Sequence, residues 1–255
     1  MEIRKAGELS YRADHWPLDP DKPTLIFLHG AGMVSTFWEF QVKALGRDVN
    51  TIAIDLPGHG DSKIPGKNNI SDYTAAVIDF IDLTGVPGPV PCGMSMGGAI
   101  AQDLLIKYPD RFPAGILINT GARLRVMPQI FETIEKNYDD FLEMLVSFAI
   151  SKKSDVETLR PIIEVTSKCE PDVALGDFAA CNGFNVIAKL GAINVPVLIM
   201  TAGDDLLTPV KYGAFLKEKI GTAELINIED AGHLSPIEKP EQVGSAIHDF
   251  LQKAF

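Results

Sequence analysis

The stretch PVPCGMSMGGAI, residues 89–100, places Ser95 between glycines directly after an apolar run. A strand that turns into a helix within one residue strains the residue at the turn, and glycine at 93 and 97 removes side chains that would collide there. The Ser95 hydroxyl is then exposed at a helix N-terminus, whose N–H groups suit a developing negative charge. The pattern predicts a nucleophile; the alternative is a glycine-rich helix start with an incidental serine.

A serine nucleophile needs a base that takes its proton, and the chain has five histidines. His233 follows the last predicted strand at a glycine-marked turn, so its ring can project over the edge of the sheet. The other four fit structural roles: His15 lies in a proline-flanked segment, His248 in the terminal helix, and His29 and His59 in glycine-rich turns. His233 is therefore the predicted base.

The base in turn needs an acid that orients its ring. The segment VLIMTAGDDLLTP ends a predicted strand with Asp204 and Asp205, and spacing alone does not choose between them. Asp230 is a weaker rival, because it lies three residues before His233 and is expected to be still on its strand. The resulting chain order, serine, acid and histidine, is that of one of the three unrelated triad folds.

A tetrahedral intermediate also needs hydrogen-bond donors for its oxygen. We expect the N–H of Met96, next after the nucleophile, and the N–H of Ala31, in the glycine turn LHGAGM after the first central strand. Apolar side chains near these atoms predict a substrate pocket, although each fits plain packing equally well. They are Met33, Met94, Leu206 and Leu207.

Short apolar runs alternate with longer segments of helical spacing. The runs, each short enough for a strand buried on both faces, lie at 24–30, 50–58, 89–95, 114–121, 195–203 and 223–232. The helical segments lie at 71–85, which Ser71 is expected to cap and Gly85 to end, and at 97–110 and 241–255. We predict an α/β fold with a mostly parallel central sheet, helices on both faces, and an antiparallel edge hairpin around Gly7.

The interval from 122 to 191 breaks this alternation, because it contains no convincing strand. Apolar residues at three- and four-residue steps predict one amphipathic helix from Ile130 to Ala149. More helix is expected at 155–168 and 172–189, interrupted near Pro161 and Pro171. We expect a core of residues 1–121 and 192–255, with 122–191 as a helical insertion above the carboxyl edge of the sheet, where α/β folds bind ligands.

The composition limits the possible partners. With 23 basic and 34 acidic residues the formal net charge is −11, which repels nucleic acid and anionic lipid. Three cysteines without a C-x-x-C pair favour free thiols in a reducing compartment, and neither a secretory leader nor an apolar run of membrane-spanning length is evident. We expect a cytoplasmic, soluble protein; nothing in the sequence indicates an oligomeric state.

Together these segments resemble the α/β-hydrolase superfamily, in particular its esterase- and lipase-like members with a helical cap. The resemblance covers nearly the whole chain, and its segments are FLHGAG, IDLPGHGDS, GMSMGGAIAQDLLIKYPDRF, INTGARL, VPVLIMTAGDDLLTP and AGHLSPIEKPEQV. It implies that residues 122–191 form a cap over the active site. It also selects Asp205 over Asp204, because the family's acid stands four residues before the proline of a D-x-x-x-P turn. Structural roles are implied for Asp55, His59, Glu238 and Pro240.

Two features bear on the subclass within this resemblance. Many esterases similar to this chain have histidine before the nucleophile, and related carbon-carbon bond hydrolases often have asparagine, whereas Met94 is neither. A serine nucleophile also speaks against haloalkane dehalogenases and epoxide hydrolases, which attack with aspartate.

The leading hypothesis is a serine hydrolase that cleaves small to medium carboxylic esters through an acyl-enzyme, with no metal or organic cofactor. The alternatives on the same triad are an enol-lactonase, a thioesterase, a carbon-carbon bond hydrolase and a perhydrolase. A ligand-binding receptor of hydrolase fold with slow turnover is the alternative from another class, because a fold does not fix a function.

Overall fold

A single eight-stranded sheet organises the computed structural model, which describes residues 2–255. Its spatial order is β1-β2-β4-β3-β5-β6-β7-β8. The β1–β2 and β2–β4 pairs are antiparallel and the other pairs parallel, which confirms the predicted mostly parallel sheet with an edge hairpin. The strands are β1 Glu2–Ala6, β2 Leu9–Ala13, β3 Thr24–Leu28, β4 Asn50–Asp55, β5 Pro89–Met94, β6 Gly115–Ile118, β7 Val197–Ala202 and β8 Ala223–Ile228.

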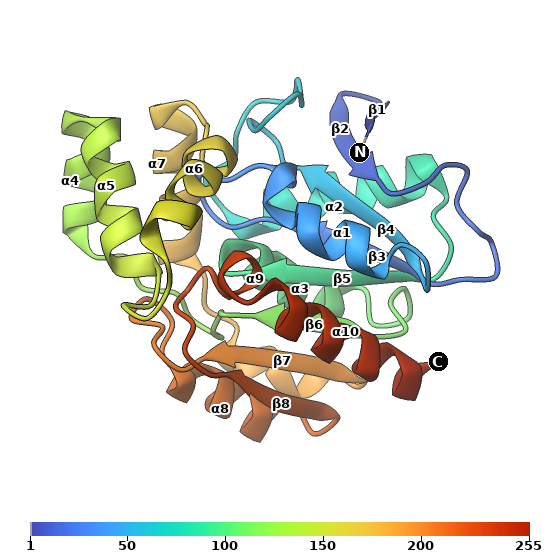
Figure 1. Cartoon of the computed structure of the whole chain (residues 1–255). Helices are drawn as coiled ribbons and strands as arrows, with labels where there is room; N and C mark the ends of the chain where they lie inside the picture. The colour runs from blue at the N-terminus through green and yellow to red at the C-terminus, as the bar shows by residue number, and fades with distance from the viewer. Residues whose placement is uncertain (1) are drawn as a thin grey trace.

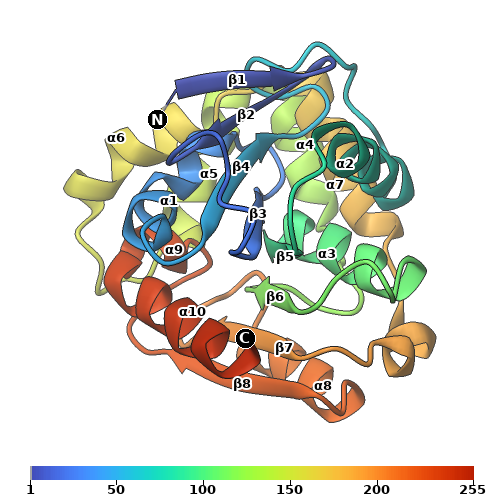
Figure 2. The same cartoon turned by 90° about the vertical axis from the view of Figure 1, so that its right-hand side faces the viewer.

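Helices cover both faces of the sheet, as predicted (Figure 2). One face carries α1 (Glu39–Leu45), α9 (Ser235–Glu238) and α10 (Pro240–Ala254), and the other carries α2 (Ile70–Thr84), α3 (Met96–Lys107) and α8 (Val210–Lys219). Two short 3-10 helices, η1 (Ser35–Trp38) and η2 (Ile187–Ala192), complete the connections. The central strands are buried on both faces, which explains their nearly continuous apolar sequences.

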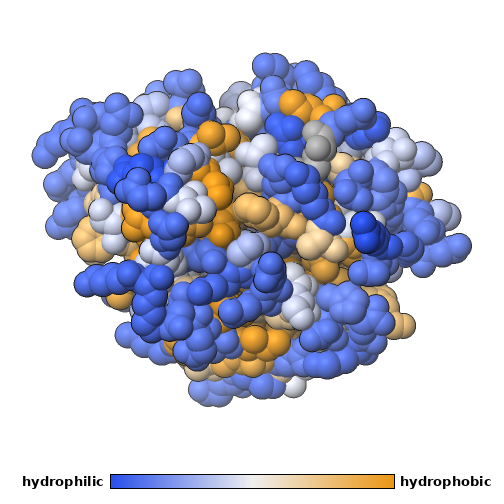
Figure 3. All heavy atoms as spheres, in the orientation of Figure 1, coloured by the Kyte–Doolittle hydropathy of each residue, from blue (hydrophilic) through white to orange (hydrophobic). Residues whose placement is uncertain are grey.

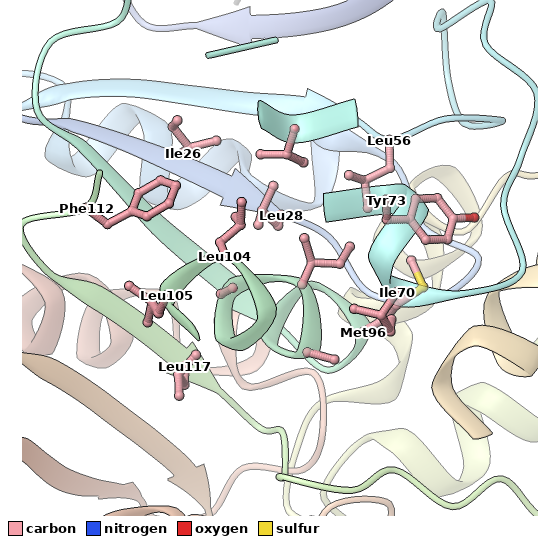
Figure 4. Packing of buried hydrophobic residues seen from close by; sticks show 14 of the residues in the cluster. Ile26, Leu28, Leu56, Ile70, Tyr73, Met96, Leu104, Leu105, Phe112 and Leu117 are labelled. Carbon is pink, nitrogen blue, oxygen red and sulfur yellow. The ribbon is translucent and has the colours of Figure 1, made fainter. Parts of the chain in front are cut away.

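The start of α3 is held in the hydrophobic core on one side of the sheet. Figure 4 shows Met96 and Leu104 of α3 packed near Leu28 of β3 and near Ile70 and Tyr73 of α2. The Met96 side chain is fully buried. A close-packed core of this kind resists displacement, so it fixes the point at which β5 turns into α3.

Four helices fill the interval between β6 and β7: α4 (Pro128–Lys136), α5 (Tyr138–Ala149), α6 (Val156–Thr166) and α7 (Pro171–Gly183). Figure 1 shows this group, the inserted helices, at the end of the sheet where the parallel strands have their carboxyl ends. The group shares a small apolar cluster of its own around Ile134, Phe141 and Ala174. Ligands of open α/β folds bind at this end of a sheet, so a functional site is expected there.

The helix boundaries correct four sequence predictions. The expected helix from 130 to 149 is two helices, because Asn137 has extended backbone and its side chain caps α5 through Asp139 N–H. Pro161 does not interrupt α6 but lies inside it, and the helix expected to reach 189 ends at Gly183. Ser71 does not cap α2, because Asn69 accepts the Asp72 N–H instead. Gly85 does end α2, in left-handed conformation.

Figure 3 shows that hydrophilic residues cover most of the face seen in Figure 1, with hydrophobic residues gathered mainly in a band through its middle. Within residues 2–255, no helix combines the length and the apolar character that crossing a membrane requires.

Candidate active site

Ser95 occupies a strained turn between β5 and α3. Its φ is 54° and its ψ is −114°, a conformation that a residue with a side chain rarely adopts. A Cβ at position 93 would lie 2.0 Å from the carbonyl oxygen of Gly97, and a Cβ at position 97 would lie 2.0 Å from that of Leu28. Glycine is therefore required on both sides of Ser95, for the steric reason expected from the sequence.

Backbone and side-chain hydrogen bonds fix this turn to the neighbouring strand. The N–H of Ser95 donates to the carbonyl of Ile118 at the end of β6, at 3.0 Å. The Thr120 hydroxyl donates to the carbonyl of Ser95 at 2.8 Å. Both partners belong to the adjacent strand and the loop after it, so contacts outside the turn hold Ser95 in its strained conformation.

His233 and Asp205 lie side by side after β8 and β7. Nδ1 of His233 is 2.9 Å from Oδ2 of Asp205, and both side chains are almost fully buried. In a neutral ring the proton therefore lies on Nδ1, and Nε2 keeps a free lone pair. The Thr208 hydroxyl donates to Asp205 Oδ2 at 2.7 Å and lies 3.2 Å from His233 Nδ1.

The Asp205 carboxyl is held in its charged form. Its Oδ1 accepts the backbone N–H groups of Leu207 and Thr208, at 2.8 and 2.9 Å. Burial opposes ionisation, but the His233 ring and the hydrogen bonds from Thr208 outweigh burial and lower the pKa of Asp205 to about 2. A fixed carboxylate beside Nδ1 orients the imidazole and stabilises its protonated form.

The two rival aspartates have other partners. Asp204 accepts the Ser151 hydroxyl at 2.6 Å and lies 3.9 Å from the ammonium of Lys153. Asp230 is exposed and binds the same lysine. Of the three candidate acids, the structure brings only Asp205 to the imidazole of His233.

The backbone around His233 is anchored from two directions. Asn119, just after β6, donates to the carbonyl of His233 and to the Ser235 hydroxyl, both at 2.8 Å. Glu238 accepts the N–H of Gly232 at 2.9 Å and the N–H of Ser151 at 2.8 Å. Glu238 thus ties the histidine loop to the segment that follows α5.

One pocket, which we call the Ser95 pocket, contains Ser95 and His233 in its lining and has a volume of about 160 Å³. Ala31 and the four predicted pocket residues, Met33, Met94, Leu206 and Leu207, line it as well. Its lining comes partly from the inserted helices, through residues such as Ile130, Leu145 and Phe178. Within residues 2–255 no hydrogen bond joins Ser95 to His233; such bonds often tighten only when substrate binds.

The two predicted oxyanion donors are the backbone N–H groups of Ala31 and Met96. Met96 is the first residue of α3, so its N–H has no intrahelical acceptor. Among residues 2–255, neither this N–H nor that of Ala31 finds an acceptor elsewhere. Ala31 lies in a turn whose neighbours are held: the Met33 N–H donates to Gly30 O, and the Gly32 N–H donates to Asp177 Oδ2 at 2.8 Å.

A buried polar cluster lies beneath this turn and contains His29 and His59. His59 contacts two acceptors, the carbonyl of Pro57 at 3.0 Å and Oδ2 of Asp177 at 2.9 Å, so both ring nitrogens carry a proton. Burial opposes this charge, but Asp177 outweighs burial and raises the pKa of His59 to about 10. Burial and the nearby His59 lower the pKa of His29 to about 4.

Comparison with known proteins assigns the chain to a family. A model described as "Alpha/beta hydrolase family" matches residues 25–246, which is most of the chain. The chain belongs to the alpha/beta hydrolase family.

Relatives of this alpha/beta hydrolase cover almost its whole length. It is 28% identical over 241 residues to 3-oxoadipate enol-lactonase 2 of Acinetobacter baylyi, covering 91% of this chain and 90% of that protein. It is 24% identical to the pimeloyl-[acyl-carrier protein] methyl ester esterase of Nitrosomonas europaea, covering 86% and 92%. The family membership and these relatives identify the chain as a hydrolase of this superfamily.

Solved structures agree on the fold. The enol-lactonase of Burkholderia xenovorans superposes with a TM-score of 0.88 over 98% of this chain and 100% of that one, at 21% identity, a likeness of fold alone. A thermophilic esterase is 28% identical, with a TM-score of 0.80 over 99% and 97% of the two chains.

Three residues at or near the site of this hydrolase were not predicted from the sequence: Thr208, Asp177 and Arg125. Thr208 had a local signal, since an aspartate three residues before a threonine is typical of a turn closed by side-chain hydrogen bonds. Asp177 had none, because its partners Gly32, His59 and Tyr73 lie more than 100 residues away. Arg125 had no signal either, because its place in the lining of the Ser95 pocket depends on the path of the chain after β6.

Proposed function

We propose that this alpha/beta hydrolase is a serine esterase that cleaves small to medium carboxylic esters through an acyl-enzyme. One observation carries the proposal: a serine on a strained turn and a histidine bonded through Nδ1 to a buried carboxylate line the same pocket. In this assignment Ser95 is the nucleophile, His233 the base and Asp205 the orienting acid.

The proposed reaction has two halves. Nε2 of His233 takes the Ser95 proton while Oγ bonds to the carbonyl carbon, and the N–H groups of Ala31 and Met96 stabilise the oxyanion. His233 then gives the proton to the leaving alcohol. In the second half His233 activates a water, which releases the acid and restores Ser95. The inserted helices act as a cap that limits the size of the acyl group.

A second candidate is hydrolysis of a lactone, which is a cyclic ester and needs the same groups. It is supported by the 28% identity to an enol-lactonase over 91% of the chain. Nothing in the proposed mechanism distinguishes an open ester from a cyclic one, because the same carbonyl carbon is attacked.

The proposal is tested with p-nitrophenyl acetate and butyrate, a lactone panel and a fluorophosphonate probe. Wild type should turn over the esters and be labelled at Ser95, and Ser95→Ala should lose both properties. Equal turnover by wild type and Ser95→Ala would refute the nucleophile. If neither hydrolyses any substrate and the probe leaves Ser95 unlabelled, a ligand-binding role replaces the enzymatic one.

A further inference from the structure

A second hollow lies next to the Ser95 pocket and shares residues with it. Its volume is about 350 Å³, and its lining includes Arg123, Arg125, Lys211 and Tyr212. Arg125 and Tyr212 also line the Ser95 pocket, so the two spaces adjoin. We call this space the arginine hollow.

The charges of the arginine hollow are unbalanced. Its lining includes three cationic residues, and no aspartate or glutamate lines this hollow or the Ser95 pocket. Among residues 2–255 the side chains of Arg123, Arg125 and Lys211 form no ion pair and no hydrogen bond. Four of the other five arginines do pair with carboxylates: Arg4, Arg12, Arg111 and Arg160. All three side chains are exposed, so solvent hydrates their charges; Arg125 differs from another exposed and unpaired cation, Arg47, in that it lines the pocket that contains Ser95.

The backbone that carries the two arginines is held in place. Arg123 forms an isolated antiparallel bridge with Asn185, and the Val186 N–H donates to Ala122 O at 2.8 Å. The Val126 N–H donates to the Asn182 side chain at 3.3 Å. These contacts join the loop after β6 to the end of α7, so the arginines extend from a braced segment.

Lys211 adds a second line of evidence. It lies in the first turn of α8, where the helix dipole is positive and an acidic residue would be favourable. That turn contains no acidic residue and has no side-chain cap. A cation at this end of the helix is electrostatically unfavourable. A bound anion would pair with the Lys211 ammonium and accept hydrogen bonds from the free N–H groups at the start of α8.

We propose that the arginine hollow binds a carboxylate at the far end of the acyl chain, so that the preferred substrates are monoesters of dicarboxylic acids. This inference rests on the proposed function. The reactive carbonyl lies at Ser95, the methylene chain crosses the apolar lining of the Ser95 pocket, and the distal carboxylate meets Arg125 where the two spaces join. Guanidinium groups suit this role because their planar donors match a carboxylate.

The test compares acyl chains of equal length with and without the distal charge. Mono-p-nitrophenyl adipate and suberate are compared with p-nitrophenyl hexanoate and octanoate, with Ser95→Ala as background. Wild type should favour the charged ester in kcat/KM by about tenfold or more, since a hydrogen bond to a charged group is worth roughly that factor. Salt should weaken the preference, because the site is open to solvent.

Arg125→Gln and the double variant with Arg123→Gln should lower this preference about tenfold, mainly through KM, because the lost contact is remote from the reacting bond. Arg47→Gln is the matched control: Arg47 is exposed and unpaired, and it lines neither space. Its preference should equal that of wild type.

Three outcomes overturn the inference. They are equal kcat/KM for charged and neutral esters in wild type, a preference that survives both arginine variants, and an equal loss in Arg47→Gln. In each case Ser95-dependent hydrolysis of the neutral esters leaves the proposed function standing. Loss of all Ser95-dependent hydrolysis would instead refute the proposed function.

Discussion

Asp177 of α7 accepts the backbone N–H of Gly32 at 2.8 Å, and this bond ties the inserted helices to the turn that carries Ala31. The same carboxylate accepts from His59 at 2.9 Å and from the Tyr73 hydroxyl, so it has three donors and is fully buried. A carboxylate with three donors fixes its neighbours closely. The position of the proposed oxyanion donor therefore depends on a residue of the inserted helices.

Asp177→Asn should lower kcat for ester hydrolysis more than it raises KM. Oδ2 of Asp177 accepts both the Gly32 N–H and His59, and an uncharged amide at this position weakens these two charge-assisted hydrogen bonds, so the turn loosens. We expect a loss of about tenfold in kcat, smaller than the hundredfold or more typical of deleting an oxyanion donor outright. Affinity for a phosphonate mimic of the tetrahedral intermediate should fall by a similar factor.

Asp172→Asn serves as the control for this experiment, because Asp172 is an exposed acid on the same helix. Rates are to be compared at a temperature where circular dichroism shows all proteins folded. Unchanged kcat and unchanged phosphonate affinity in folded Asp177→Asn would show that Asp177 supports only the packing of α7.

The ion pair between His59 and Asp177 should make the free energy of unfolding fall as the pH rises above neutral. The pKa of His59 is raised from 6.5 to about 10, so the folded state keeps a proton that the unfolded state loses. The stabilisation is thus fully present below pH of about 6.5 and is lost as pH rises towards about 10. Urea unfolding from pH 6 to 10 should show the free energy of unfolding falling more steeply for wild type than for His59→Gln. Parallel curves would contradict a charged His59.

The elements around Ser95 were predictable because their signals are local. Gly93 and Gly97 were recognisable because a side chain at either position would clash with backbone atoms of the turn or of the adjoining strand. The central strands were recognisable because apolar runs of strand length are typical of strands buried on both faces. The break between two helices at Asn137 was not predicted. Apolar residues recur at the same helical spacing before and after Asn137, whereas the cap that starts the second helix depends on the Asn137 side chain alone. Asp177 and Arg125 were missed because their roles arise only when segments distant in sequence meet.

Gly93→Ala should disrupt the Ser95 turn. Its Cβ would lie 2.0 Å from Gly97 O, a backbone atom that cannot move without shifting α3. We expect a loss of more than about 3 kcal/mol in the free energy of unfolding, beyond the usual cost of overpacking, and loss of fluorophosphonate labelling. Gly221→Ala is the control, since no atom lies within 4 Å of its added Cβ. A Gly93→Ala protein with wild-type stability and labelling would contradict this account of the turn.

The two adjacent aspartates should differ sharply in their effect on rate. Asp205→Asn keeps the shape of the side chain but removes the charge beside His233 Nδ1 and favours the wrong tautomer, so kcat should fall by about 10⁴. Asp204→Asn keeps an oxygen that can accept the Ser151 hydroxyl and loses only the charge that faces Lys153 at 3.9 Å, so its rate should stay within about threefold of wild type.

The same pair of variants also separates stability from catalysis. The depressed pKa of Asp205, about 2, means that its carboxylate adds stability above pH of about 4 and loses it as pH falls towards about 2. Acid unfolding of Asp205→Asn should therefore be less steep than that of wild type over this range, whereas Asp204→Asn should follow wild type. A larger rate loss in Asp204→Asn than in Asp205→Asn would reverse the assignment of the acid, because the residue that orients His233 must be the one whose charge the rate depends on.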